Sequence, residues 1–100
     1  MFDKKYQTRT VAFDVNLEIQ MILWSMIDKW KEHGKELDYL QIFELSIVNI
    51  NGKPVQKVIH HQEVPPLKEE KLFKVHQPMN CRLWVVDSEV AAVMMFPEEY

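Results

Sequence analysis

The chain contains very little glycine: among its 100 residues there are 2, Gly34 and Gly52. Loops that hold phosphate groups through backbone N–H groups usually need several closely spaced glycines. Both glycines have a structural explanation, one at the end of an expected helix and one in an expected turn. A nucleotide-binding loop of the glycine-rich kind is therefore excluded.

Cysteine is almost absent as well, with Cys81 as the single thiol. One thiol cannot form an internal disulfide, whereas small secreted domains are usually held together by several. Lys4 and Lys5 stand near the start, but no apolar segment follows them, so no signal peptide is expected. The densest apolar stretch, residues 19–27, is far shorter than the ~20 residues of a membrane-spanning helix. We expect a cytoplasmic protein with no disulfide and no membrane partner.

Charge of one sign does not dominate, because the formal net charge is -3. A small negative charge gives little attraction to nucleic acid or to anionic lipid. The best basic group is formed by Lys4, Lys5 and Arg9 around Tyr6. Weak nucleic-acid binding by these residues is kept only as a second alternative function.

The composition is typical of a globular protein, with 47% hydrophobic and 27% charged residues. Disordered chains are more polar and more highly charged. A length of 100 residues leaves no room for a second core of useful size. We expect a single domain over residues 1–100.

The clearest local pattern predicts an amphipathic helix over residues 17–33. Apolar residues recur there at the three-and-four spacing of one helical face, namely Ile19, Ile22, Leu23, Met26, Ile27 and Trp30. Asn16 or Asp14 can cap its start, and Gly34 stands where a left-handed terminating residue is expected.

A β-hairpin is predicted next, with strands over residues 38–50 and 54–64 and Asn51-Gly52 between them. Asn-Gly is typical of a two-residue type I′ turn. That turn predicts the pairs Val48 with Val55, Leu45 with Val58 and Phe43 with His60. The missing N–H of Pro54 would then point away from its hairpin partner, which indicates a strand that begins at an edge.

The remaining segments complete an α+β fold of the order β-α-β-β-β-β. Residues 65–78 contain three prolines and a charged run, and are expected to connect two hairpins with at most a turn or two of helix. Residues 81–87 and 90–96 are expected to form the second hairpin, and residues 6–13 alternate weakly as a further strand. The expected architecture is one amphipathic helix packed on a mostly antiparallel sheet of four to five strands.

Several phrases, spread over nearly the whole chain, together resemble one family. They are Tyr6-Gln7-Thr8-Arg9, Leu23-Trp24-Ser25-Met26-Ile27-Asp28, Asp38-Tyr39-Leu40-Gln41-Ile42-Phe43, His61-Gln62-Glu63-Val64-Pro65, Leu83-Trp84-Val85-Val86-Asp87 and Phe96-Pro97-Glu98-Glu99-Tyr100. As a set they resemble the small staphylococcal-type family called domain of unknown function 960. The resemblance implies a protein of low-GC Gram-positive bacteria. It assigns no activity, and no catalytic or binding residue can be carried over from it.

Polar residues that could form a catalytic or metal site are few and badly spaced. His60, His61, Glu63 and Cys81 are the candidates for a site assembled only in three dimensions. Neighbouring residues on a strand point to opposite faces, so His60 and His61 cannot act as a close ligand pair. A lone cysteine at the start of an apolar strand is usually a small core residue. No catalytic residue, metal or cofactor is expected, and a small-ligand-binding protein or enzyme is the first alternative function.

An apolar surplus on the expected helix is more informative. Leu17, Met21 and Trp24 form a second stripe beside the face that should pack on the sheet. Methionine and tryptophan are frequent at partner surfaces, although core packing accounts for most of them. The leading hypothesis is a non-enzymatic protein-interaction module or small homodimer that uses this stripe or an open sheet edge.

Overall fold

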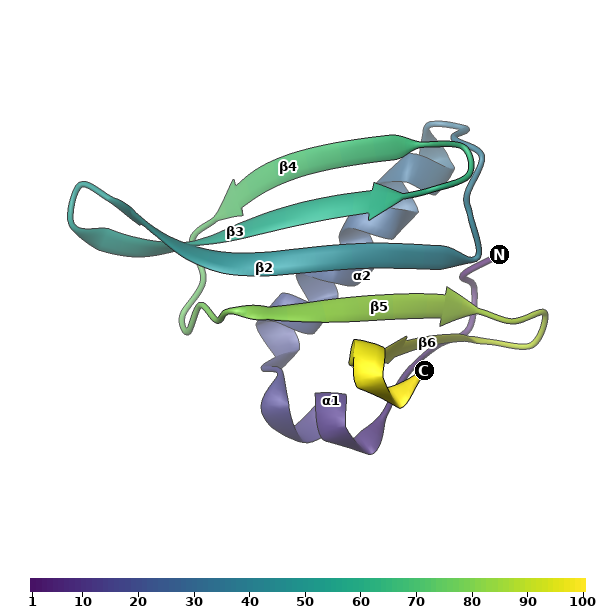
Figure 1. The fold of residues 1–100 in the computed structure, drawn as a ribbon, viewed down its shortest axis with the longest axis horizontal. Helices are drawn as coiled ribbons and strands as arrows, with labels where there is room; N and C mark the ends of the chain where they lie inside the picture. Colours follow the sequence, from purple (N-terminus) through teal and green to yellow (C-terminus); the bar gives the residue numbers. More distant parts are fainter.

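A mixed sheet packs against one face of a long helix in the computed structural model, which describes all residues 1–100 (Figure 1). The elements in chain order are β1 (Lys5–Gln7), α1 (Arg9–Asp14), α2 (Leu17–Glu32), β2 (Leu40–Ile50), β3 (Lys53–Gln62), β4 (Leu67–Phe73), β5 (Cys81–Asp87), β6 (Ala92–Met95) and the 3-10 helix η1 (Pro97–Glu99). This is an α+β fold, as expected from the sequence.

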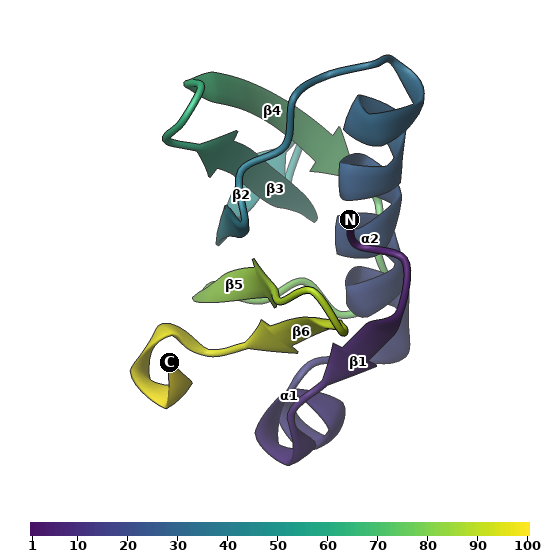
Figure 2. The same ribbon diagram turned by 90° about the vertical axis from the view of Figure 1, so that its right-hand side faces the viewer.

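The sheet has six strands in the order β1-β6-β5-β2-β3-β4. Only the β1–β6 pair is parallel, and the other four neighbouring pairs are antiparallel. The expected count of four to five strands was therefore too low. Helix α2 covers one face of the sheet, whereas η1 lies on the other side (Figure 2).

Helix α2 begins and ends where its local signals place it. The side chain of Asn16 accepts a hydrogen bond from the backbone N–H of Ile19 at 3.0 Å, and Gly34 follows the helix with φ of 72°. Five of the six residues of the predicted apolar face are buried, while Ile22 is half-buried and packs against the core.

The β2–β3 hairpin confirms the register predicted from its turn. Asn51 and Gly52 have φ of 51° and 78°, the positive values that a type I′ turn requires. Phe43 lies opposite His60, and the two further predicted pairs, Leu45 with Val58 and Val48 with Val55, are also present. Pro54 precedes the part of β3 that pairs with β4, which begins at Gln56, so its missing donor disturbs no ladder.

The charged segment within residues 65–78 is a strand, and the expected turns of helix are absent. In β4, the half-buried Leu67, Glu69, Lys71 and Phe73 alternate with the exposed Lys68, Glu70 and Leu72. An alternation with a period of two is the pattern of a strand. Charged residues occupy both the half-buried and the exposed positions, so the sequence shows no alternation of apolar and polar residues here. The segment still connects the two hairpins along the chain.

The weak strand expected over residues 6–13 is also corrected, because β1 stops at Gln7. The hydroxyl of Thr8 accepts a hydrogen bond from the backbone N–H of Val11 at 3.2 Å and so caps α1. Helix α1 then buries Val11 completely. A capping threonine followed by an apolar residue three positions later decided this segment in favour of helix.

Side chains of the sheet divide cleanly between its two faces. Leu83 and Val85 of β5 are fully buried in the core beneath α2. Trp84 between them therefore points to the opposite face, next to Ile42 of β2 and Met95 of β6. There its ring meets that of Tyr100 edge to face, with centroids 5.5 Å apart.

Candidate interaction surface

The stripe predicted on α2 lies on the side of the helix that faces away from the sheet. Leu17 is 67% exposed and Met21 is 63% exposed. Trp24 is half-buried and packs against the core cluster. Residues at these spacings share one side of a helix, and this side is separate from the one that buries Leu23 and Ile27.

A further exposed apolar residue, Phe13, lies near the end of α1. Its side chain is 83% exposed, more than any other large apolar side chain of the protein. Phe13 was not among the predicted surface residues, because residues 6–13 were expected to form a strand. Val15 and Asn16 are extended between the two helices, so Phe13 is not part of the same helical face. We call Leu17, Met21 and Trp24 together the α2 patch.

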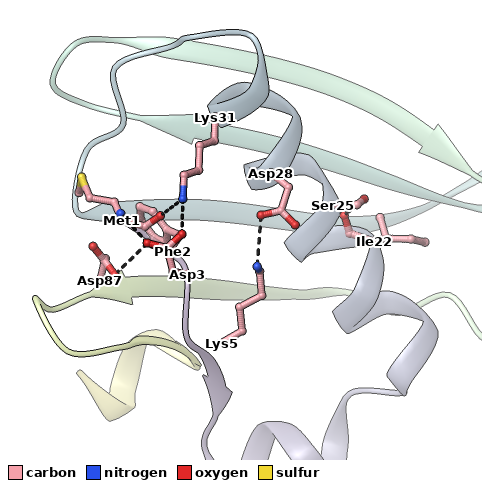
Figure 3. A network of polar contacts seen from close by, with 9 residues as sticks. All are labelled: Met1, Phe2, Asp3, Lys5, Ile22, Ser25, Asp28, Lys31 and Asp87. Carbon is pink, nitrogen blue, oxygen red and sulfur yellow. Dashed lines mark hydrogen bonds and ion pairs between the residues drawn. The ribbon is translucent and has the colours of Figure 1, made fainter.

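The N-terminal segment forms polar contacts with the rest of the same side of α2 (Figure 3). Asp28 and Lys31 continue the spacing of the patch toward the end of the helix. Nζ of Lys5 lies 3.4 Å from Oδ1 of Asp28, and Lys31 donates to the carboxylate of Asp3. The hydrogen bond from Lys31 lowers the pKa of Asp3 to about 2. The outer side of α2 is thus polar and paired with the N-terminal segment at one end, and apolar without such contacts at the other.

His60, the first of the polar candidates, is completely buried between aromatic rings. Its ring lies 3.7 Å from that of Trp30 and 4.4 Å from that of Phe43, and both pairs are stacked. Burial is the largest cause that lowers the pKa of His60 to about 3. A histidine in this state remains neutral and stays inside the core at ordinary pH.

Two glutamines, neither of them among the residues predicted from the sequence, hold His60 in place. Nε2 of Gln41 donates to Gln62 at 2.7 Å and to the carbonyl oxygen of Asp38 at 2.9 Å. Its Oε1 must therefore accept, and Nε2 of His60 lies 2.6 Å from it. Nδ1 of His60 is then the unprotonated nitrogen, and it has no hydrogen-bond partner.

Gln62 extends this network to two loops. Its side-chain amide donates to the carbonyl oxygens of Glu36 and Pro65, both at 2.9 Å. The network therefore joins the segment after α2 to the β3–β4 turn. Every one of these bonds lies within the protein, which makes the arrangement a structural support for the core.

The other three polar candidates lie in different surroundings. His61 points to the open face of the sheet, where Nε2 is 3.4 Å from Oε2 of Glu44. Glu63 is exposed in the β3–β4 turn. Cys81 is half-buried, and burial raises the pKa of its thiol to about 11, which is unfavourable for a nucleophile. No hydrogen bond or ion pair joins any two of the four candidates, and no three His, Cys, Asp or Glu side chains form a group that could hold a metal ion.

Surface hollows do not coincide with the candidate residues, apart from Cys81. The largest, of about 670 Å³, lies between residues 1–4, Tyr39 and the β5–β6 turn. A second, of about 470 Å³, is lined by Cys81 together with Glu44, Ser46 and Asn80 among others. The basic residues Lys4, Lys5 and Arg9 are exposed, and Lys5 is already paired with Asp28.

Comparison with known proteins places this arrangement in a family. Residues 4–99 match the family described as staphylococcal protein of unknown function (DUF960). The chain belongs to the DUF960 family. No curated protein matches it, and no helix of this DUF960 protein is long and apolar enough to cross a membrane.

A solved structure shares the DUF960 fold described above. It is the crystal structure of a protein of unknown function from Enterococcus faecalis, 20% identical, with a TM-score of 0.76. The similarity covers 97% of this chain and 90% of the other. At this identity the likeness concerns the fold, and it adds no activity.

Proposed function

We propose that the protein is a non-enzymatic protein-interaction module of the cytoplasm, which binds its partner through the α2 patch. The observation that carries the proposal is the high exposure of Leu17 and Met21 on a helix whose opposite side is fully packed. Single exposed apolar residues are ordinary on protein surfaces, but several on one rigid element are typical of a contact surface. Trp24 and Met21 also belong to the residue types that are enriched at such contacts.

The size of the patch limits the strength of the complex. Burial of Leu17 and Met21 would contribute roughly 1.5–3 kcal/mol each. A micromolar complex needs about 8 kcal/mol net, after the cost of association. The patch alone therefore supports a weak complex, and a tighter one must include Trp24 and neighbouring polar residues.

The cytoplasmic location rests on cysteine usage. The one thiol, Cys81, forms no disulfide, and small extracellular domains usually depend on several disulfides. Fractionation of the native host, with the protein followed by antibody, tests this part of the proposal. Recovery in the culture medium or the membrane fraction would contradict it.

Site-specific photo-cross-linking tests the patch directly. A photoreactive phenylalanine analogue at position 21 should cross-link the partner in the living host, and the product should disappear when Leu17→Glu is added. The matched control carries the analogue at Lys29, which is exposed on α2 outside the patch. Cross-linking of the same products with equal yield at positions 21 and 29 would refute a specific role for the patch.

The alternative functions gain no support from the positions of their candidate residues. A ligand-binding or enzymatic site would need His60, His61, Glu63 and Cys81 to converge, and they lie in separate surroundings. Nucleic-acid binding would need a free basic cluster, and Lys5 is paired with Asp28. Titration with single-stranded oligonucleotides at low salt would reveal such binding by its steep salt dependence.

A further inference from the structure

Strand β4 forms one edge of the sheet and has a partner on one side only (Figure 1). It pairs with β3 from Leu67 to Phe73 without interruption. Among the hydrogen bonds outside the regular ladders, none involves the backbone of residues 67–73. The outer side of β4 therefore offers unpaired N–H and C=O groups along its length.

The turn of the neighbouring hairpin determines which residues carry these free groups. In a hairpin with a two-residue turn, the flanking pair, here Ile50 and Lys53, is hydrogen-bonded, and such pairs recur at every second position. The residues of β3 that point toward β4 are then those of even number. Their partners are the odd-numbered residues of β4, so the free groups belong to Lys68, Glu70 and Leu72.

The order of charges along this edge suits one antiparallel pairing of two copies. Residues 67–72 are Leu-Lys-Glu-Glu-Lys-Leu. When two copies pair antiparallel about a two-fold axis with Glu70 opposite Glu70, each Glu69 lies opposite Lys71 of the other copy. Lys68 then lies opposite Leu72. The free backbone groups of Lys68, Glu70 and Leu72 in one copy therefore face those of Leu72, Glu70 and Lys68 in the other, which gives about six backbone hydrogen bonds.

Charges within each copy make this register acceptable. Glu69 and Lys71 already lie 3.5 Å apart within one chain. Opposite charges placed across two strands attract, so the same two residues also attract their counterparts in the other copy, once on each side of the axis. The two Glu70 side chains meet at the axis as like charges, but Nζ of Lys57 lies 3.0 Å from each Glu70 carboxylate within its own copy. Sheet edges in natural proteins are often protected from pairing with another chain by lysine. The edge strand β4 carries both lysine and glutamate, in an order that places opposite charges across the two copies.

We propose that a second copy of this chain pairs antiparallel with β4, so that the two sheets become one continuous sheet. The inference goes beyond the proposed function, because the dimer leaves the α2 patch free. That patch lies toward the start of α2, beside α1, while β4 lies at the far end of the sheet (Figure 2). The contact is narrow, so the dimer forms at high protein concentration and dissociates on dilution.

Cysteine cross-linking tests the register residue by residue. In a Cys81→Ala background, Glu70→Cys places two thiols opposite each other at a Cα separation of about 5.5 Å, within the range of a disulfide. Mild oxidation should convert this variant to a covalent dimer at least tenfold faster than Lys68→Cys or Leu72→Cys alone. A mixture of the latter two should cross-link to each other. Equal rates for all single variants would overturn the proposal.

A charge exchange provides the second test, without any cysteine. Lys71→Glu should weaken dimerisation in sedimentation equilibrium by about tenfold, because both attractive pairs become repulsive. Adding Glu69→Lys to the same chain should restore it, since each pair is then reversed rather than lost. A strictly monomeric wild-type chain at millimolar concentration would overturn the dimer. That result would leave the cross-linking test at position 21 unaffected, so the two proposals fail separately.

Discussion

The ring of His60 lies almost parallel to the ring of Trp30, with 3.7 Å between their centroids and 16° between their planes. One ring comes from β3 and the other from α2, so this contact joins the two layers of the protein. Its strength depends on the charge of the imidazole, because the neutral ring can be buried and the cation cannot be buried without a partner.

Acidification should therefore destabilise the protein through His60. The pKa of His60 is about 3 in the folded protein, against an ordinary value of 6.5. Between these values the unfolded chain binds the extra proton, so stability is full above pH 6.5 and falls as the pH drops toward 3. Each pH unit in this window removes up to about 1.4 kcal/mol. Urea unfolding at several pH values measures this slope.

The slope has a matched control on the adjacent residue. His60→Phe should flatten the dependence between pH 6.5 and 4, whereas His61→Phe should reduce it only slightly, because the charge of His61 is the smaller of the two causes of the low pKa of His60. Asp3 does not interfere, because its pKa falls from 3.8 to about 2 and its contribution is lost only below this window. An unchanged slope in His60→Phe would show that other groups cause the acid sensitivity.

Replacement of Gln62 by leucine should lower the free energy of unfolding by more than the similar size of the two side chains suggests. Gln62→Leu leaves Gln41 without one acceptor and the carbonyl oxygens of Glu36 and Pro65 without their donor. An unsatisfied buried polar group costs roughly 1–3 kcal/mol, so we expect a loss of about 2–4 kcal/mol in urea unfolding. Gln77→Leu, at an exposed position, should change stability by less than about 0.5 kcal/mol.

The α2 patch should tolerate polar substitutions that the other side of the helix cannot. Leu17→Gln and Met21→Gln should change the free energy of unfolding by no more than about 0.5 kcal/mol, because both side chains are largely exposed. Leu23→Ala should cost about 2–5 kcal/mol, because Leu23 is completely buried. Thermal unfolding of the three variants provides the comparison. A large loss in Met21→Gln would mean that the patch is packed within the protein.

The β2–β3 turn should be sensitive at Gly52. Its φ of 78° is unfavourable for a residue with a Cβ by roughly 1–2 kcal/mol, so Gly52→Ala should destabilise the protein by that amount. Open space surrounds the position, so a steric clash does not add to the cost. Lys53→Ala, one residue later, serves as the control and should have little effect on urea unfolding.

Local signals were sufficient for the elements whose interactions are local. Asn16 and Gly34 mark the ends of α2, and the helix needs nothing distant to explain its bounds. Asn51 and Gly52 define a turn, and a two-residue turn sets the register of everything that follows on both strands. The pairing of Phe43 with His60 could therefore be predicted before any sheet was known.

Segments that depend on distant partners were predicted less well. Leu67–Phe73 forms a strand because it pairs with β3 along its whole length. An edge strand buries only part of one face, so its charged residues give little indication of a strand in the sequence. Residues 5–7 form a strand because they meet β6, almost a whole chain length away. The missing strand in the predicted sheet has this origin, whereas the mistaken strand over residues 6–13 has a local one, because Thr8 caps α1.

The sequence by itself determined the α+β class, the family, the main helix, the first hairpin and the apolar stripe, because each of these depends on residue types at short spacings. Only the tertiary structure decided that His60 is buried between Trp30 and Phe43, and that Trp84 faces away from α2. It also decided that the N-terminal segment pairs with Asp28 and Lys31 near the end of α2 while Leu17 and Met21 stay exposed. These outcomes depend on which surfaces meet when the layers pack, and a linear pattern does not contain that information.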